Sequence, residues 1–101
     1  MMLTKNKIIQ ILKAEQPFLR EQFGVKRIAI FGSFAQGHAH QKSDVDVFVE
    51  FSKSPGMRFF DLMDYLDKKI GRKTDVLTQK GLSSIHIKRV VQEIKRTLVY
   101  V

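Results

Sequence analysis

The sequence predicts an α/β fold in which helices pack on a small mixed sheet, and three observations support this prediction. Apolar residues recur at helical spacing in three long segments, residues 4–22, 59–70 and 83–98. Three shorter segments have the composition or the alternation of strands, residues 26–31, 44–51 and 73–78. The two kinds of segment alternate along the chain, which is typical of a sheet covered by helices. With one further short helix, the expected order is α-β-α-β-α-β-α.

The first helix is expected over residues 4–22. Its apolar stripe consists of Ile8, Ile11, Leu12, Leu19 and Phe23. Pro17 interrupts this pattern, because proline lacks the N–H of a helical hydrogen bond, so we expect a kink or a two-piece helix near Gln16. Gly24 is a suitable C-terminal stop, since glycine adopts the left-handed conformation that ends many helices.

The middle of the chain predicts two strands joined by a short turn. Residues 26–31 are expected to form a buried strand, 33–37 one helical turn and 38–43 a loop. The next strand alternates cleanly over residues 44–51. One face holds Val45, Val47, Val49 and Phe51, and the other holds Asp44, Asp46, Phe48 and Glu50.

The last part of the chain predicts a helix, a short strand and a final helix. The helix over residues 59–70 is expected to stop at Gly71. The strand over residues 73–78 places Asp75 and Leu77 on one face. Ser83 or Ser84 is expected to cap the final helix, since short hydroxyl side chains accept hydrogen bonds from the first free N–H groups. Its stripe is Ile87, Val90, Val91, Ile94 and Leu98.

Composition sets limits on the class of protein. The 101 residues are 44% apolar, which predicts a single folded domain over residues 1–101. The absence of cysteine excludes disulfides and thiolate metal sites. The apolar runs are too short to span a membrane, and residues 1–7 do not resemble a signal-peptide core. We therefore expect a soluble, cytoplasmic protein.

The net charge of +8 is unevenly distributed. Residues 1–31 carry a net charge of +4, residues 32–50 one of −2, and residues 51–101 one of +6. An acidic segment within a basic chain suits a metal site that attracts a polyanionic nucleotide. The same basic charge equally suits an acidic protein partner, RNA, or simply a well-solvated surface.

The strongest indication of function is Gly32-Ser33 followed, after ten residues, by Asp44-Val45-Asp46. A Gly-Ser turn after a strand offers main-chain N–H groups and a hydroxyl to a phosphate. Asp44 and Asp46 point to one face of their strand. Two like charges side by side repel each other unless a divalent cation lies between them. This combination predicts a nucleotidyl-transfer site.

Such a site also needs a third carboxylate, for a second metal ion or as the base for the incoming hydroxyl. Asp75 fills this role if its strand pairs with the strand of Asp46. The other candidate acids are better explained as the polar side of the helix over residues 59–70, namely Asp61, Asp64 and Asp67. A His-x-His pair at His38 and His40 has no evident third ligand, so we do not expect a transition-metal site there.

These motifs resemble the minimal nucleotidyltransferase family of the DNA polymerase β-like superfamily. Its signature is a Gly-Ser pair, ten residues and Asp-x-Asp, and residues 73–78 resemble its third-carboxylate strand. The resemblance spans roughly residues 8–98. It implies a mixed sheet with helices on one side, Mg²⁺ (two ions) and an NTP donor, usually ATP. It also implies that Gly32 and Ser33 hold the triphosphate. The metal ligands and catalytic acids would be Asp44, Asp46 and Asp75.

Small members of this family resemble the antitoxin of a toxin–antitoxin pair. Their partner is typically a helical HEPN-domain ribonuclease, inhibited by binding or by attachment of AMP to a tyrosine. The family usually has arginine where this chain has Gln36 in its nucleotide-binding turn. Lys42 in the following loop is the candidate for the missing positive charge, although lysine lacks the planar donor fork of arginine.

Three functions follow from the sequence. The leading prediction is a Mg²⁺-dependent adenylyltransferase that modifies a hydroxyl of an acidic or helical partner protein. The alternative is a binding module with weak catalysis that neutralises its partner stoichiometrically, and Gln36 is its main support. An RNA-binding module ranks lowest, because no array of aromatic residues offers a platform for base stacking.

Overall fold

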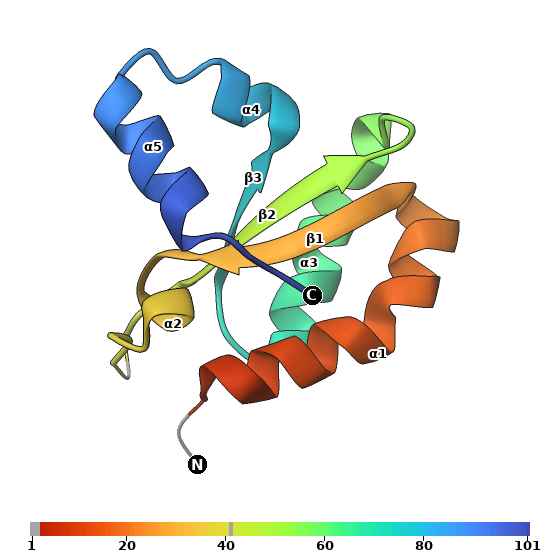
Figure 1. Cartoon of the computed structure of the whole chain (residues 1–101). Coiled ribbons are helices and arrows are strands. Elements are labelled where there is room, and N and C mark those ends of the chain that lie inside the picture. Colours follow the sequence, from red (N-terminus) through yellow and green to blue (C-terminus); the bar gives the residue numbers. More distant parts are fainter. Residues whose placement is uncertain (1–2, 41) are drawn as a thin grey trace.

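The computed structural model describes residues 3–40 and 42–101. Figure 1 shows a twisted sheet at the centre with helices on both of its faces. In chain order the elements are α1 (Lys5–Phe23), β1 (Val25–Phe31), α2 (Gly32–Gln36), β2 (Val45–Phe51), the 3-10 turn η1 (Gly56–Arg58), α3 (Phe59–Ile70), β3 (Thr74–Thr78), α4 (Gln79–Ser83), α5 (Lys88–Thr97) and β4 (Val99–Tyr100).

The sheet has the strand order β3-β2-β1-β4. β1 pairs antiparallel with both β2 and β4, whereas β2 pairs parallel with β3. The helix α3 makes the crossover that a parallel pair requires. The predicted class, a small mixed sheet with helices packed on it, is therefore confirmed.

The main core lies between the sheet and the pair α1 and α3. The predicted alternation places Val45, Val47 and Val49 in this core, and all three are fully buried. The opposite face carries a smaller cluster around Ala29, Phe48 and Leu82, against which α4 and α5 pack. Helices thus cover both faces, and the expectation of helices on one side is wrong, because α4 and α5 return to the second face.

The helix α1 runs as one element through Pro17, so a break into two helices is wrong. Figure 1 shows α1 changing direction in its C-terminal part, as expected for a proline that cannot donate to the preceding turn. The hydroxyl of Thr4 caps its start by accepting from the N–H of Lys7 (3.2 Å). Gly24 ends it with φ = +70°.

The final helix begins later than predicted, and a separate short helix that the sequence did not indicate precedes it. Ser83 ends α4 and Ser84 is its C-cap, so neither residue begins the last helix. The hydroxyl of Thr78 accepts from the N–H of Gly81 (3.0 Å), which starts α4 directly after β3. An irregular segment then leads to α5, which begins only at Lys88. Within the described part of the chain, no helix combines the length and apolar character needed to cross a membrane.

Candidate active site

The Gly-Ser turn joins β1 to α2. Gly32 begins α2 with φ = +70°, a backbone conformation that residues with a Cβ rarely adopt. A Cβ at this position would also collide with Oδ2 of Asp46 and lie 3.2 Å from its Cγ. The carbonyl of Ser33 accepts from the N–H of His38 (2.8 Å), which closes the turn at Gly37. The backbone of Gly32 therefore lies directly against the Asp46 carboxylate.

Strand pairing brings two of the predicted carboxylates together. Asp46 of β2 is the register partner of Asp75 in β3, and its partner on the other side is Phe31, the last residue of β1. Register partners in a sheet point to the same face. Asp44 lies two residues before Asp46, immediately outside β2. Asp44, Asp46 and Asp75 thus gather at one end of the sheet, next to α2.

Burial and the neighbouring carboxylates change the pKa of Asp46. Partial burial raises the pKa of the Asp46 carboxyl above its ordinary value, and the negative charges of Asp75 and then Asp44 raise it further. The ionised form of Asp46 is therefore disfavoured in the folded protein. A divalent cation shared by these carboxylates would remove that repulsion.

The donor set fits Mg²⁺ held together with a nucleotide. Across residues 3–40 and 42–101, no group of three or more His, Cys, Asp or Glu side chains could hold a metal ion by itself, so water and phosphate oxygens would have to complete any coordination here. The carboxylates are instead open to solvent: Asp75 is exposed, and Asp44 and Asp46 are half-buried. Mg²⁺ at nucleotide sites takes one or two carboxylates and completes its shell with water and phosphate oxygens. An open cluster suits this coordination.

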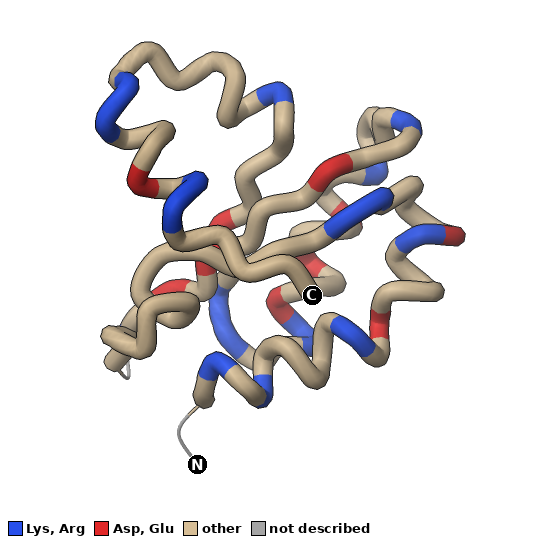
Figure 2. The backbone as a smooth tube through the Cα atoms, viewed as in Figure 1, with Lys and Arg blue, Asp and Glu red and all other residues tan. Residues whose placement is uncertain are grey.

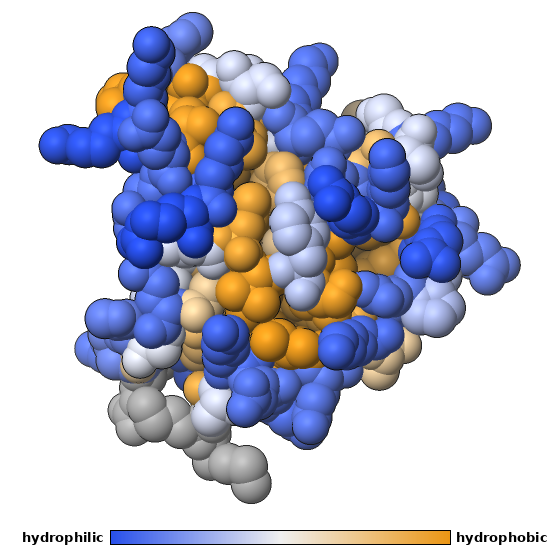
Figure 3. Space-filling view, viewed as in Figure 1, coloured by the Kyte–Doolittle hydropathy of each residue, from blue (hydrophilic) through white to orange (hydrophobic). Residues whose placement is uncertain are grey.

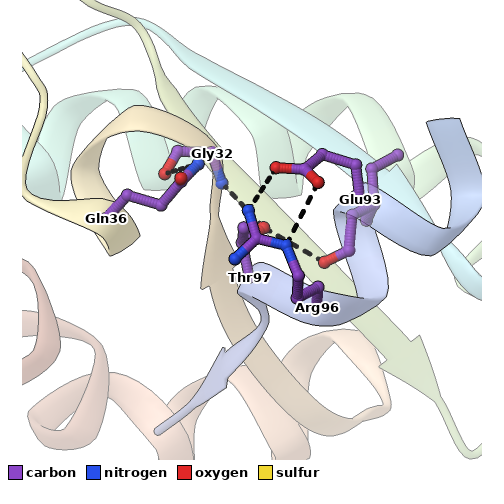
Figure 4. Close-up of polar contacts among 6 residues, drawn as sticks. Gly32, Gln36, Glu93, Arg96 and Thr97 are labelled. Carbon is purple, nitrogen blue, oxygen red and sulfur yellow. Dashed lines mark hydrogen bonds and ion pairs between the residues drawn. The ribbon is translucent and has the colours of Figure 1, made fainter. Parts of the chain in front are cut away.

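The two remaining predicted residues lie beside the turn. Gln36 is exposed on α2, and its Nε2 donates to the carbonyl of Gly32 (3.4 Å), as Figure 4 shows. Lys42 is exposed in the loop before β2, where its backbone N–H donates to Nδ1 of His40 (3.3 Å). No hydrogen bond or ion pair between described residues links either side chain to Asp44, Asp46 or Asp75. Their roles toward a nucleotide stay predictions.

Thr97 is a part of the site that the sequence did not indicate. Its hydroxyl accepts from the N–H of Gly32 (3.4 Å), as Figure 4 shows, and it donates to the carbonyl of Ile94 (3.1 Å). Thr97 is buried although it is polar. It joins the end of α5 to the Gly-Ser turn across 65 positions of the sequence. No local sequence pattern predicts such a contact, because neither Thr97 nor Gly32 has a neighbouring residue that indicates a distant partner.

Arg72 supports the loop that precedes Asp44. Its Nη1 donates to the carbonyls of His40 (3.2 Å) and Ser43 (3.0 Å). Its guanidinium also lies over the ring of Phe34, 5.5 Å from the ring centre. Arg72 comes from the connection between α3 and β3, so it links this connection both to the loop and to α2. The sequence offered no signal for it beyond an unassigned basic residue.

Asp67, predicted as part of the polar side of its helix, makes specific hydrogen bonds in the structure. Its Oδ1 accepts from both the N–H (2.8 Å) and the hydroxyl (2.6 Å) of Thr74. Thr74 is the first residue of β3 and is buried. Asp67 thereby fixes the start of β3, one residue before Asp75.

Acidic and basic residues occupy different parts of the structure around the site. Figure 2 shows acidic segments at the end of the sheet near α2, with Lys and Arg on α1 and α5 around them. The predicted acidic segment within a basic chain thus corresponds to a local acidic cluster in space. A metal–nucleotide complex carries both signs of charge, and this arrangement offers carboxylates to the metal and a basic surround to the phosphates.

Comparisons with known proteins identify the family of this chain. The family model for the nucleotidyltransferase domain matches residues 6–101. The protein adenylyltransferase MntA of Thermococcus cleftensis is 39% identical over 94 residues, which cover 92% of this chain and 95% of that protein. Among solved structures, one reported as a minimal nucleotidyltransferase has a TM-score of 0.75 at 21% identity, and the match covers 96% of this chain and 95% of that one.

A second solved structure is the complex of the Shewanella oneidensis HEPN toxin, tri-AMPylated, with its MNT antitoxin. One chain of it has a TM-score of 0.54 at 18% identity, over 95% of this chain and 66% of that one. At these identities the two solved structures show the fold alone, whereas the family model and the Thermococcus relative show the family. This chain belongs to the nucleotidyltransferase domain family and is an enzyme of that family.

Proposed function

We propose that this protein transfers AMP from ATP to a tyrosine hydroxyl of a partner protein, with Mg²⁺, and that the partner is a HEPN-type ribonuclease toxin. The observation that carries this proposal is the contact of Gly32 with Asp46, beside Asp75, because the Gly-Ser turn that we expect to bind phosphate then lies against a carboxylate cluster. The 39% identical relative is named a protein adenylyltransferase, and the Shewanella complex holds an AMPylated HEPN toxin.

In this reaction the acceptor oxygen attacks the α-phosphorus of ATP, the bond to pyrophosphate breaks, and the hydroxyl proton passes to a base. Bound Mg²⁺ would neutralise the charge that develops on the phosphate oxygens and the leaving group. Asp44 and Asp46 would hold the metal. Asp75 is exposed beside Asp46, so it would either complete the metal site or take the proton from the acceptor.

The chain's remaining residues would bind and orient the triphosphate. We assign Gly32 and Ser33 to the β- and γ-phosphates, since the turn presents backbone groups beside the carboxylates. Gln36 is exposed on α2 and Lys42 is exposed in the loop before β2, and both would face the phosphates, as a neutral and a charged donor. We expect a single domain over residues 1–101, and we propose that the acceptor binds on the surface of this domain.

The test uses purified protein, Mg²⁺ and α-³²P-labelled ATP, with and without the protein encoded beside it. Label is expected to move to that protein and to be absent with Asp44→Ala. Asp44 is half-buried outside β2, so this variant should still fold, and its thermal unfolding should match the wild type. Transfer that persists in a folded Asp44→Ala variant would refute the site assignment.

A second candidate function is stoichiometric inhibition by binding, and the position of Gln36 favours it. Its amide is hydrogen-bonded to Gly32 of the same helix, and a glutamine lacks the guanidinium that would stabilise charge on the phosphates. This function predicts that Asp44→Ala neutralises the partner fully and without ATP. The ribonuclease activity of the partner, measured with and without nucleotide, separates the two functions.

A further inference from the structure

The helix α5 buries little of its apolar surface. Apolar residues recur along it at positions i, i+3, i+4 and i+7, namely Ile87, Val90, Val91 and Ile94. Ile87 is 61% exposed and Val90 is 39% exposed, whereas Val91 and Ile94 are half-buried against the sheet. A helix with this spacing normally covers its stripe completely. Here one edge of the stripe stays in contact with solvent.

Two shallow hollows lie on different faces of α5 near this exposed edge. The first, of about 390 Å³, lies between α4 and α5 and is lined by Leu82, Ser83, Ile85, Lys88, Val91, Gln92 and Lys95. The second, of about 370 Å³, is lined by Arg89, Val90, Glu93 and Ile94. We call these residues, together with Ile87, the α5 surface. Figure 3 shows apolar surface at this end of the molecule, bordered by strongly hydrophilic side chains.

The border of the α5 surface is basic. Residues 79–97 contain five Lys and Arg side chains and one acidic side chain, Glu93. Glu93 is already paired with Arg96 (Nε–Oε2 3.1 Å). Among the described residues, Lys88, Arg89 and Lys95 have no such carboxylate partner. An apolar stripe between unpaired positive charges complements an amphipathic helix whose apolar face is flanked by Asp and Glu.

The α5 surface lies close to the candidate active site. Phe48 and Leu77 follow Asp46 and Asp75 by two residues on β2 and β3, and both pack in the cluster beneath α4 and α5. The carboxylates and α5 therefore share one face of the sheet. At its C-terminal end, α5 contacts the Gly-Ser turn through Thr97. A protein bound on α5 would have its neighbouring segments next to the carboxylates.

We propose that the α5 surface binds an acidic amphipathic helix of the acceptor protein and so presents the acceptor hydroxyl to Asp44, Asp46 and Asp75. This inference rests on the proposed function for the identity of the partner. The interaction itself follows from shape and charge. A helix is the matching occupant because helices pack by placing their ridges in the grooves beside a partner helix.

Val90→Glu tests the apolar stripe, because it places a carboxylate where the partner's acidic flank would lie. Val90 is already partly exposed, so the variant should fold. The matched control is Met57→Glu, which makes the same kind of change at an 83% exposed position of η1. We expect Val90→Glu to raise the KM for the acceptor protein about tenfold, with kcat and the KM for ATP unchanged, and Met57→Glu to leave all three unchanged.

Binding without chemistry separates this inference from the proposed function. The probes are two synthetic peptides of about 15 residues with one leucine stripe, flanked by Glu in one and by Lys in the other. By fluorescence anisotropy, the Glu peptide should bind the full chain about tenfold more tightly than the Lys peptide, and less tightly at high salt or to Val90→Glu. Equal binding of both peptides, or no loss with Val90→Glu, would overturn the inference even if AMP transfer occurs. Preference for the Glu peptide without any AMP transfer would uphold it while the proposed function fails.

Discussion

Gly32 and Asp46 form one steric unit, although 13 residues separate them in the chain. The Cα of Gly32 lies so close to the carboxylate that a Cβ there would overlap Oδ2 and lie 3.2 Å from Cγ of Asp46. The antiparallel pairing of Phe31 with Asp46 produces this contact, because Gly32 directly follows Phe31. A glycine at the turn and an aspartate on β2 therefore depend on each other, which gives a physical reason for the spacing of the motif.

Gly32→Ala should destabilise the protein by about 3 kcal/mol, because the alanine meets both an unfavourable φ and the Asp46 carboxylate. Gly37→Ala is the control for conformation alone. Its φ is +77°, but no atom lies within 4 Å of an added Cβ, so the expected cost is about 1 kcal/mol. Urea denaturation at neutral pH measures both. Equal losses would show that the Gly32–Asp46 contact is not a steric constraint.

A double-mutant cycle tests the same contact from its other side. Asp46→Ala removes the carboxylate and leaves Cβ, 3.5 Å from the added methyl group, which is an ordinary contact. In this background Gly32→Ala should cost only about 1 kcal/mol, leaving about 2 kcal/mol of coupling between the positions. Additive losses would contradict this prediction.

Asp46→Asn should stabilise the metal-free protein at pH 7 by up to about 1 kcal/mol, a figure reduced because the carboxylate is still partly solvated. Burial and the charges of Asp75 and Asp44 raise its pKa above the ordinary 3.8, so ionisation weakens folding. In the wild type, the stability that comes from protonated Asp46 is fully present below the ordinary pKa of 3.8. It is lost as the pH rises through the higher pKa of the folded state. Thermal unfolding measures the effect: the melting temperature of Asp46→Asn should exceed that of the wild type by an amount that grows from pH 3 to pH 7.

The response to Mg²⁺ independently tests the repulsion of Asp46 by Asp75 and Asp44. Added Mg²⁺ should raise the melting temperature of the wild type at pH 7, because binding to the folded state alone stabilises it. The rise should be smaller in Asp46→Asn. Asp64→Asn, on the exposed side of α3, is the matched control and should respond to Mg²⁺ as the wild type does. Identical responses in all three proteins would argue against a metal at Asp46.

The motif and the strand alternation sufficed to predict the sheet and the gathering of the carboxylates. The alternation over residues 44–51 set the face of Asp46, and Asp75 followed from its place on the next strand. Thr97 and Arg72 were not predictable in this way, since they contact backbone groups distant in sequence. The short helix α4 and the late start of α5 were also missed, because Ser83 and Ser84 are typical N-cap residues by type, whereas in the structure they end α4.

Arg72→Met should loosen the loop that carries Lys42 and precedes Asp44. The variant loses the hydrogen bonds to His40 and Ser43, worth about 1 kcal/mol, while a methionine still packs near Phe34. Hydrogen exchange of residues 38–44 should accelerate, and the affinity for Mg²⁺-ATP should fall about tenfold. Arg72→Lys should restore part of both. Unchanged exchange in this loop would show that Arg72 does not hold it.

Gln36→Arg should increase AMP transfer about tenfold, which corresponds to about 1.4 kcal/mol of transition-state stabilisation. The weak hydrogen bond from Gln36 to Gly32 (3.4 Å) is easily given up, and Gln36 is exposed beside the turn, so an arginine fits without repacking. Its planar guanidinium is positively charged and can donate two parallel hydrogen bonds from two nitrogens to a phosphate, whereas an amide is neutral and has one nitrogen. Gln10→Arg, on the exposed side of α1, adds the same charge far from the site and should leave the rate unchanged. Initial rates with α-³²P-labelled ATP at saturating acceptor measure the effect. A rate for Gln36→Arg no higher than that of Gln10→Arg would mean that Gln36 does not face the phosphates, and that the absence of arginine there does not limit catalysis.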